Sequence, residues 1–168
     1  AEGEVLIPLD EEGLAALSDK LDQLGIEAAA IMFINCYANG AHEARAKELL
    51  SKRHPGMFVS ASPEVSQEYR EFERCSTVAA NAYIGPKVRR YVGEIDDHIR
   101  KAGFGGSFLI VQSTGGLYES EQAQTHGVRM LEAGPAAGGI GTQALCHTIG
   151  IQDPIARELG GRTRKPRG

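Results

Sequence analysis

The segment from Glu132 to Thr142, EAGPAAGGIGT, holds four glycines, three alanines and one proline in eleven positions. A glycine inside a helix costs roughly 0.5 to 1 kcal/mol relative to alanine, so such a run needs a compensating contact. Gly134, Gly138 and Gly141 stand at i, i+4 and i+7 and would line one face of a helix. Pro135 suits the first turn of that helix. The segment therefore predicts a helix whose bare face accepts either a second helix at close range or a ligand.

Charge and hydropathy exclude several classes of protein. The net charge of −4 conceals a split, because residues 157–168 hold five of the eighteen Lys and Arg residues and one of the twenty-two acids. Residues 1–156 therefore carry 13 − 21 = −8, which argues against nucleic-acid binding. No apolar run approaches the roughly 18 residues of a membrane span, and no leader opens the chain, so we expect no membrane segment and a cytoplasmic location.

Helical and strand-like patterns alternate along the first two thirds of the chain, which predicts an α/β fold. A leucine repeat after Asp10 predicts the first helix, and continuous apolar runs predict buried strands. Pro86 is expected to break a long helical region in two, the first helix ending near Tyr83. The expected helices are 11–24, 41–53 and 64–102, and the expected strands are 28–34, 57–60 and 108–113.

A second glycine pair follows the last of these strands, in QSTGG (Gln112 to Gly116). Ligands of open α/β sheets gather at the carboxyl ends of strands, and consecutive glycines leave backbone N–H groups free to face them. Ser113, Thr114, Gly115 and Gly116 are therefore candidate cleft residues. A plain strand-to-helix turn explains the same residues equally well.

Two further residues stand out in ERCSTVAANAY (Glu73 to Tyr83). Asn81 is a poor helix former among alanines, which indicates a specific side-chain hydrogen bond. Arg74 has acidic neighbours and could simply form surface ion pairs. The three cysteines are far apart, so we expect buried thiols and neither a disulfide framework nor a metal site.

In their order along the chain, these motifs closely resemble those of the hydantoinase A and 5-oxoprolinase family, which includes subunits of acetone and acetophenone carboxylases. The resemblance covers residues 4–156 and rests on EVLIPLD, YANGAHEARAKEL, ERCSTVAANAYIGP, FLIVQSTGGL and VRMLEAGPAAGGIG. Through ERCSTVAANAY it also implies that Asn81 and Arg74 line the substrate or nucleotide cleft together with residues 113–116.

The resemblance implies the lobes of an actin-like (ribonuclease H-like) ATPase, incomplete in this segment. Residues 1–72 would end the N-terminal lobe, residues 73–156 would begin the central hydantoinase A domain, and residues 157–168 would be an atypical basic tail. GPAAGGIG would be the first of two helices that cross at the hinge between lobes. We therefore expect Gly134, Gly138 and Gly141 to pack at the hinge, and to lie exposed where the second helix is missing.

The family's phosphate-binding turns are similar to Asp-x-Gly-Gly-Thr. Gly160, Gly161 and Thr163 match the second turn, but Glu158 replaces the aspartate and Arg162 replaces a small hydroxyl residue. We therefore expect a degenerate loop or an altered chain end, with no ATP hydrolysis by this segment alone.

The resemblance implies an ATP-dependent hydrolase that opens a cyclic amide such as hydantoin or 5-oxoproline. ATP and a divalent metal ion would serve the whole protein, with a hydantoinase B-type subunit or domain as partner. A ketone carboxylase subunit and a truncated, non-catalytic interaction module remain alternatives. An actin-like or sugar-kinase ATPase outside the family would need different residues around QSTGG.

Overall fold

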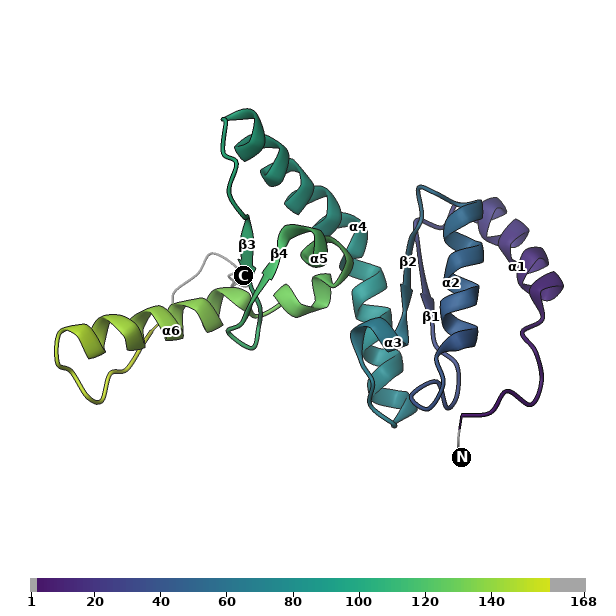
Figure 1. Ribbon diagram of the computed structural model, residues 1–168, viewed down its shortest axis with the longest axis horizontal. Helices are drawn as coiled ribbons and strands as arrows, with labels where there is room; N and C mark the ends of the chain where they lie inside the picture. Colours follow the sequence, from purple (N-terminus) through teal and green to yellow (C-terminus); the bar gives the residue numbers. More distant parts are fainter. Residues whose placement is uncertain (1–2, 158–168) are drawn as a thin grey trace, which may run out of the picture.

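The computed structural model describes residues 3–157 and shows two small α/β units on one long helix, α4 (Glu71–Lys101). The first unit packs on the N-terminal half of α4 and the second on its C-terminal half (Figure 1). No helix in this described part is both long and apolar enough to cross a membrane.

The first unit is built on two parallel strands, β1 (Ala28–Ile31) and β2 (Phe58–Ala61). Helices α1 (Glu11–Gln23) and α2 (Ala41–Arg53) cover one face, and α4 covers the other (Figure 1). The short helix α3 (Ser62–Val65) then leads towards α4. Alternate residues of the strands face the two helical layers, which is why continuous apolar runs mark buried parallel strands.

The start of α1 follows the sequence closely, because its signal is local. Asp10 is the N-cap, and its side chain accepts a hydrogen bond from the Gly13 N–H at 2.9 Å. A buried clasp joins α1 to α2: the Ser18 hydroxyl lies 2.5 Å from His54 Nε2, and His54 Nδ1 lies 2.9 Å from an Asp22 oxygen. Ser18 is only 2% exposed, and the backbone N–H groups around it bond within α1. These contacts therefore hold α1 and α2 together, and no free backbone donor beside Ser18 could stabilise an oxyanion in a reaction.

Helix α4 runs without interruption through Pro86, so the expected break there is wrong. Proline removes one backbone donor and crowds the preceding turn, at a cost of about 3 kcal/mol or more. Packing on both units offsets this cost, because Val78, Ala82 and Val92 of the helix are buried. The helix also begins later than expected, at Glu71, since residues 66–70 are not helical.

The second unit is an antiparallel hairpin, β3 (Leu109–Val111) and β4 (Leu117–Glu119), followed by three helical elements. Its core joins Val92, Tyr118 and Ala123. The elements after the hairpin are α5 (Ser120–Thr125), a 3₁₀ turn η1 (Gly127–Met130) and α6 (Ala133–Thr148). Helix α6 packs on β3 near its start and then projects away as an arm (Figure 1).

Four further sequence expectations are corrected by this structure. The first expected strand ends at Ile31 rather than residue 34, and the third spans Leu109–Val111. The chain after that third strand turns back into β4 instead of entering a helix. Cys36 and Cys146 are buried as expected, but Cys75 is exposed on α4.

Gly85 allows α4 to approach the sheet closely. A Cβ at this position would lie 2.3 Å from the ring of Phe58, and the Arg89 guanidinium lies 4.6 Å from the centroid of the same ring. We expect Gly85→Ala to lower the free energy of unfolding by about 1 to 3 kcal/mol through overpacking. The midpoint of urea unfolding of the 168-residue chain measures this change.

Gly93→Ala is the matched control on the same helix. The nearest atom to its added Cβ is the Gln124 side-chain oxygen at 3.7 Å. We expect a gain of roughly 0.5 to 1 kcal/mol from helix propensity. A gain in both variants would show that α4 does not press on Phe58.

Candidate functional site

The two glycine-rich segments singled out in the sequence meet in space. The β3–β4 turn contains Ser113 to Gly116, and it lies against the start of α6. The Ser113 N–H and hydroxyl both donate to the Arg129 carbonyl, at 2.7 and 2.8 Å. The same hydroxyl accepts from the Glu132 N–H at 3.0 Å. Ser113 therefore ties the hairpin turn to η1 and to the N-cap residue of α6.

Gly115 brings the turn into direct contact with α6. Its φ is +85°, and a Cβ there would lie 2.5 Å from the Ile140 side chain. Both the conformation and the contact favour glycine. The turn is closed by the Gly115 N–H donating to the Gln112 carbonyl at 2.9 Å.

This junction fits a positioning role better than a preformed phosphate cradle. Ser113 commits its hydroxyl to backbone groups, and an antiparallel hairpin lacks the convergent carboxyl ends of a parallel sheet. Thr114 and Gly116 are exposed. Cleft lining by residues 113–116 stays a prediction.

Asn81 is buried, and its side chain bonds to both units of the molecule. Its amide donates to Ser60 Oγ of β2 and to the Thr125 carbonyl, each at 2.9 Å. Its carbonyl accepts from the Val128 N–H of η1 at 3.0 Å. The side chain is saturated by protein, as a poor helix former inside a helix suggested.

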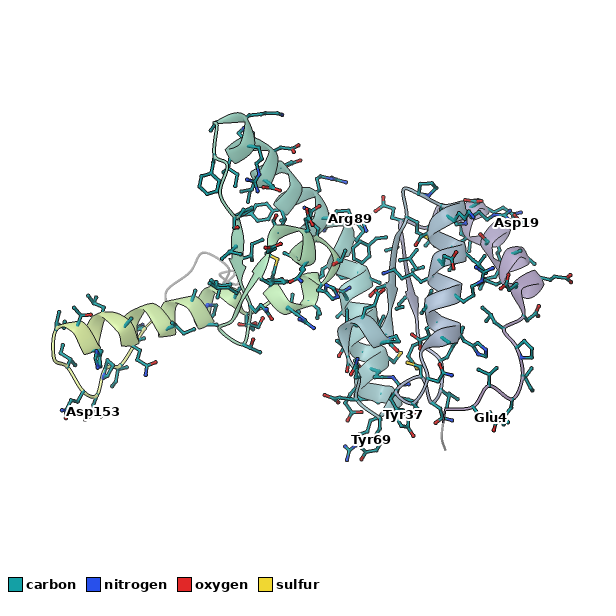
Figure 2. All side chains as sticks on the ribbon, in the orientation of Figure 1. Glu4, Asp19, Tyr37, Tyr69, Arg89 and Asp153 are labelled. Carbon is teal, nitrogen blue, oxygen red and sulfur yellow. The ribbon has the colours of Figure 1, made fainter. Side chains whose placement is uncertain are left out.

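Arg74 is fully buried and does not form the surface ion pair considered for it. Its guanidinium donates to the Phe33 and Glu68 carbonyls, each at 2.9 Å, and lies 5.8 Å from the ring centroid of Tyr37. Figure 2 shows Tyr37 and Tyr69 at this same end of the first unit. Arg74 therefore holds the loop after β1, and its contacts are to protein groups.

Glu43 is a buried carboxylate that the sequence did not single out. It accepts from the Phe33 N–H at 2.5 Å, and from the Ser62 N–H and hydroxyl at 2.8 and 3.0 Å. Nothing in the polar run AHEARAKELL distinguishes it from surface acids. Beside it, burial raises the pKa of the Cys36 thiol, which stays protonated and is a poor nucleophile.

The three candidate hinge glycines are exposed, as predicted, and their packing at a hinge stays a prediction. A Cβ at Gly138 or Gly141 would meet nothing within 4 Å. Leu145 and Ile149 lie on the same face and are 61% and 59% exposed. The face is thus bare near the start of α6 and apolar towards its end.

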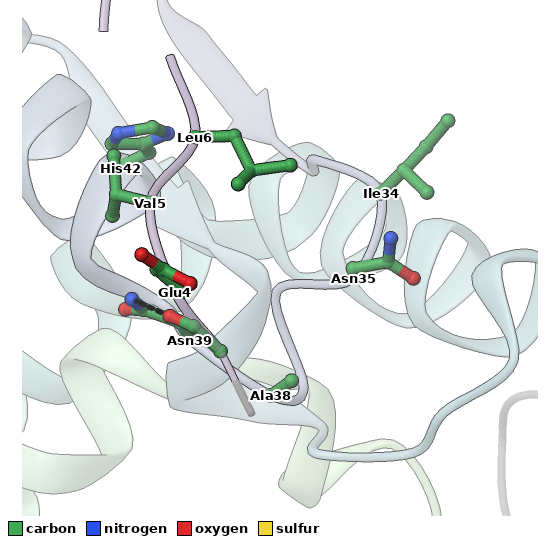
Figure 3. Close-up of a pocket in the computed structure, with 9 residues that line it drawn as sticks. Glu4, Val5, Leu6, Ile34, Asn35, Ala38, Asn39 and His42 are labelled. Atoms are coloured by element: carbon green, nitrogen blue, oxygen red, sulfur yellow. Dashed lines mark hydrogen bonds between the residues drawn. The ribbon is translucent and has the colours of Figure 1, made fainter. Parts of the chain in front are cut away.

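A depression of about 420 Å³ lies away from this junction, where residues 3–6 cross the loop after β1 (Figure 3). Glu4, Asn39 and His42 supply its polar groups, and the Asn39 amide donates to the Gly3 carbonyl at 2.7 Å. Leu6 and Ile34 on its rim are 86% and 75% exposed. This open, partly apolar surface resembles a protein contact more than a small-molecule pocket.

Within residues 3–157, no cluster of three or more His, Cys, Asp or Glu side chains could hold a metal ion. The candidate phosphate loop, with Glu158, Gly160, Gly161 and Thr163, lies outside the described residues.

Family comparisons account for most of the chain. Residues 74–165 match the family described as Hydantoinase/oxoprolinase, and residues 1–54 match the Hydantoinase/oxoprolinase N-terminal region. An uncharacterized protein of Methanocaldococcus jannaschii is 33% identical over 98% of this chain and 24% of its own length. The caprolactamase alpha subunit of Pseudomonas jessenii is 30% identical over 96% of this chain and 23% of its own length. The acetophenone carboxylase gamma subunit of Aromatoleum aromaticum is 27% identical over 95% of this chain and 22% of its own length.

Solved structures show the same fold. The ATP-dependent caprolactamase from Pseudomonas jessenii superposes with a TM-score of 0.75 at 30% identity, over 90% of this chain and 22% of that one. Nucleotide-free acetone carboxylase superposes with a TM-score of 0.74 at 22% identity, over 86% of this chain and 21% of that one. These neighbours confirm the predicted fold class, an α/β segment of incomplete actin-like ATPase lobes. The chain spans about a quarter of the length of the three relatives named above.

Ser113→Ala should loosen the start of α6. The change leaves the Glu132 N–H without its acceptor, and we expect a loss of about 1 kcal/mol in stability together with faster exchange of that amide. Hydrogen exchange followed by NMR measures the amide directly. Thr114→Ala, one residue along the turn at an exposed side chain, is the control and should change neither quantity. Equal exchange of the Glu132 amide in both variants would refute the tie.

Proposed function

The chain belongs to the hydantoinase/oxoprolinase family, and from this premise we propose that it is part of an ATP-dependent hydrolase subunit that opens a cyclic amide. The substrate would be of the hydantoin or 5-oxoproline type. Support comes from relatives named for lactam chemistry, the caprolactamase subunit and a 5-oxoprolinase of Arabidopsis thaliana that is 28% identical.

A ketone carboxylase subunit is the second candidate. The acetophenone carboxylase gamma subunit is 27% identical, close to the value for the plant 5-oxoprolinase. The described residues do not contain a substrate pocket that separates the two. The lactam reading is preferred because the 30% identical relative and its solved structure both carry the caprolactamase name.

The role that we propose for this segment rests on one observation, the projection of α6 away from the second unit. A helix with a bare, exposed face and a firmly tied start is suited to slide against a second helix while its base stays fixed. We assign α6 to the hinge between two lobes, where its movement would open and close the nucleotide cleft. Gly134, Gly138 and Gly141 would make this packing possible.

The glycine-rich candidate cleft segment does not itself fit ATP or a metal ion. The turn at residues 113–116 has no lysine or carboxylate, and Ser113 is committed to backbone groups. Nucleotide and metal would therefore be held mainly by other parts of the whole protein. The relatives named as alpha and gamma subunits favour a further subunit, for which a hydantoinase B-type chain is our proposal, in the cytoplasm.

The proposed reaction can be tested on the full-length protein with its partner subunit. Release of ADP and of the ring-opened product would be measured with hydantoin, 5-oxoproline and caprolactam, and separately with acetone or acetophenone plus bicarbonate. We expect ADP release to depend on a cyclic amide. ADP release only in the presence of a ketone and bicarbonate, and not with any cyclic amide, would favour the carboxylase. The 168-residue chain by itself should show no ATP turnover above background.

Gly138→Leu should separate a hinge role from a role in folding. Its side chain would enter open space in this chain, so we expect little change in stability of the 168-residue segment. In the full-length protein it would prevent close helix packing, and we expect ATP-dependent activity to fall at least about tenfold, a loss equivalent to about 1.4 kcal/mol. Steady-state rates and urea midpoints measure the two effects.

Ala144→Leu is the matched control, since Ala144 is also exposed on α6 but lies about 120° around the helix from Gly138. It should leave the activity near that of the unchanged protein. Full activity of the Gly138 variant would refute the hinge.

A further inference from the structure

The corner between α5 and η1 lies against the middle of α4. Helix α5 ends at Thr125, η1 begins at Gly127, and Gly127 is buried. A Cβ at Gly127 would lie 3.1 Å from the side chain of Val88, so the backbone of the corner approaches α4 closely. The packing therefore brings the ends of two short helical elements within reach of a side chain on α4.

The Asn81 amide binds both ends of this corner. Its NH₂ group donates to the Thr125 carbonyl at 2.9 Å, and its carbonyl accepts from the Val128 N–H at 3.0 Å. The last carbonyl groups of one helix and the first N–H groups of the next have no partner inside their own helices. One planar side chain thus satisfies the end of α5 and the start of η1 together.

The same NH₂ group also reaches β2. It donates to Ser60 Oγ at 2.9 Å, and Ser60 is 2% exposed. Ser60 is the third of the four residues of β2, close to the carboxyl end of a parallel strand. Ligands of open α/β sheets gather at that end of the strands. Asn81 therefore connects the functional end of the parallel sheet to the corner that precedes α6.

Hydrogen bonds continue from the corner to α6 through Ser113. The Arg129 carbonyl of η1 accepts from the Ser113 N–H and hydroxyl, and the Glu132 N–H donates to the same hydroxyl. Glu132 is the N-cap residue of α6, and its own side chain makes no capping bond. Two side chains, Asn81 and Ser113, thus link the start of α6 to β2, and neither belongs to α6.

We propose that Asn81 is a positioning residue for α6, whose amide makes the direction of this helix depend on the end of β2. The inference deepens the proposed function and rests on the assignment of α6 to the hinge between two lobes. A displacement of β2 on ligand binding would move the amide, and the corner and the start of α6 would move with it. Asn81 acts through these groups and contacts no substrate, because its amide is fully bonded to protein.

Hydrogen exchange of the Glu132 amide, followed by NMR in the 168-residue chain, tests the link without any assay of activity. We expect Asn81→Leu to speed this exchange at least about tenfold, although Asn81 does not bond to Glu132. Ser60→Ala removes one acceptor at the far end of the link and should speed the exchange about threefold. This milder variant keeps the test decisive if the Asn81 variant fails to fold. Unchanged exchange in Ser60→Ala would overturn the proposal.

A double variant identifies the route of the effect. In Ser113→Ala the Glu132 N–H has already lost its acceptor, so adding Asn81→Leu should change its exchange less than about twofold. An Asn81→Leu effect of the same size with and without Ser113 would show that Asn81 acts by another route. That result would overturn the proposal.

Val78→Ala is the matched control for lost stability. Val78 is 1% exposed and lies three residues before Asn81 on α4. Its substitution removes buried methyl groups and lowers the urea midpoint, but it leaves the hydrogen bonds of the link in place. The Glu132 amide should exchange within about twofold of its original rate. An acceleration as large as that of Asn81→Leu would indicate general loosening and would contradict a specific link.

Steady-state kinetics of the full-length protein with its partner subunit test the role in turnover. ADP release is measured with whichever cyclic amide or ketone supports it, so the result does not depend on the substrate class. We expect kcat per folded molecule to fall about tenfold in Asn81→Leu and about threefold in Ser60→Ala, with KM values for ATP and substrate changed less than about twofold. Val78→Ala should keep both constants. A rise in KM at constant kcat would assign Asn81 to substrate binding and overturn the proposal.

Gly138→Leu separates this inference from the hinge assignment on which it rests. If Gly138→Leu loses activity while Asn81→Leu keeps its kcat, the hinge stands and the positioning role of Asn81 is wrong. Full activity in both variants would overturn the hinge assignment together with this inference. Loss of kcat in both, with faster Glu132 exchange in the Asn81 variant, is the result that we expect.

Discussion

The structure depends on the side chain of Asn81, which connects the two units through one residue of α4. Its three hydrogen bonds join β2 to the end of α5 and to η1. A buried hydrogen bond contributes about 1 kcal/mol, and leaving such groups unpaired costs more. Because η1 is bonded in turn to Ser113, and Ser113 to Glu132, the bonds extend from the parallel strands to the start of α6.

A second set of buried groups gives the loop after β1 its shape. Glu43 accepts from the N–H of Phe33, and Arg74 donates to its carbonyl, so opposite charges from two helices hold both backbone polar groups of one residue. Buried charges carry a large desolvation cost, which is offset here by several hydrogen bonds to backbone groups. The loop after β1, which borders the depression of about 420 Å³, is therefore held by buried hydrogen bonds on its interior side. Its outer side carries exposed apolar residues.

Elements with local signals agreed well with the sequence. Asp10 and the leucine repeat placed α1 within a residue, and the bare face of α6 followed from glycine spacing alone. One expectation failed because the deciding contacts are distant in sequence: Pro86 stays helical because both units pack on α4. The turn at residues 113–116 joins a hairpin because β4 pairs with β3, and that local pairing had no clear strand pattern after Gly116 to announce it. The buried roles of Glu43 and Ser18 were not predictable, since Glu43 shares α2 with the exposed Glu48 and Ser18 precedes exposed polar residues of α1.

The sequence by itself determined the α/β class, the family and the small-residue face of α6. Hydrophobic periodicity, helix caps and ordered motifs depend on residues that are close together in the chain, so they can be recognised without the tertiary structure. The tertiary structure alone decided that the two glycine segments touch, through Gly115 and Ile140. It also decided that Arg74 and Asn81 are interior residues and that, within residues 3–157, β1 pairs with β2 alone. These features depend on which surfaces pack across long separations in the chain, and burial of a polar side chain depends on those surfaces rather than on its neighbours in sequence.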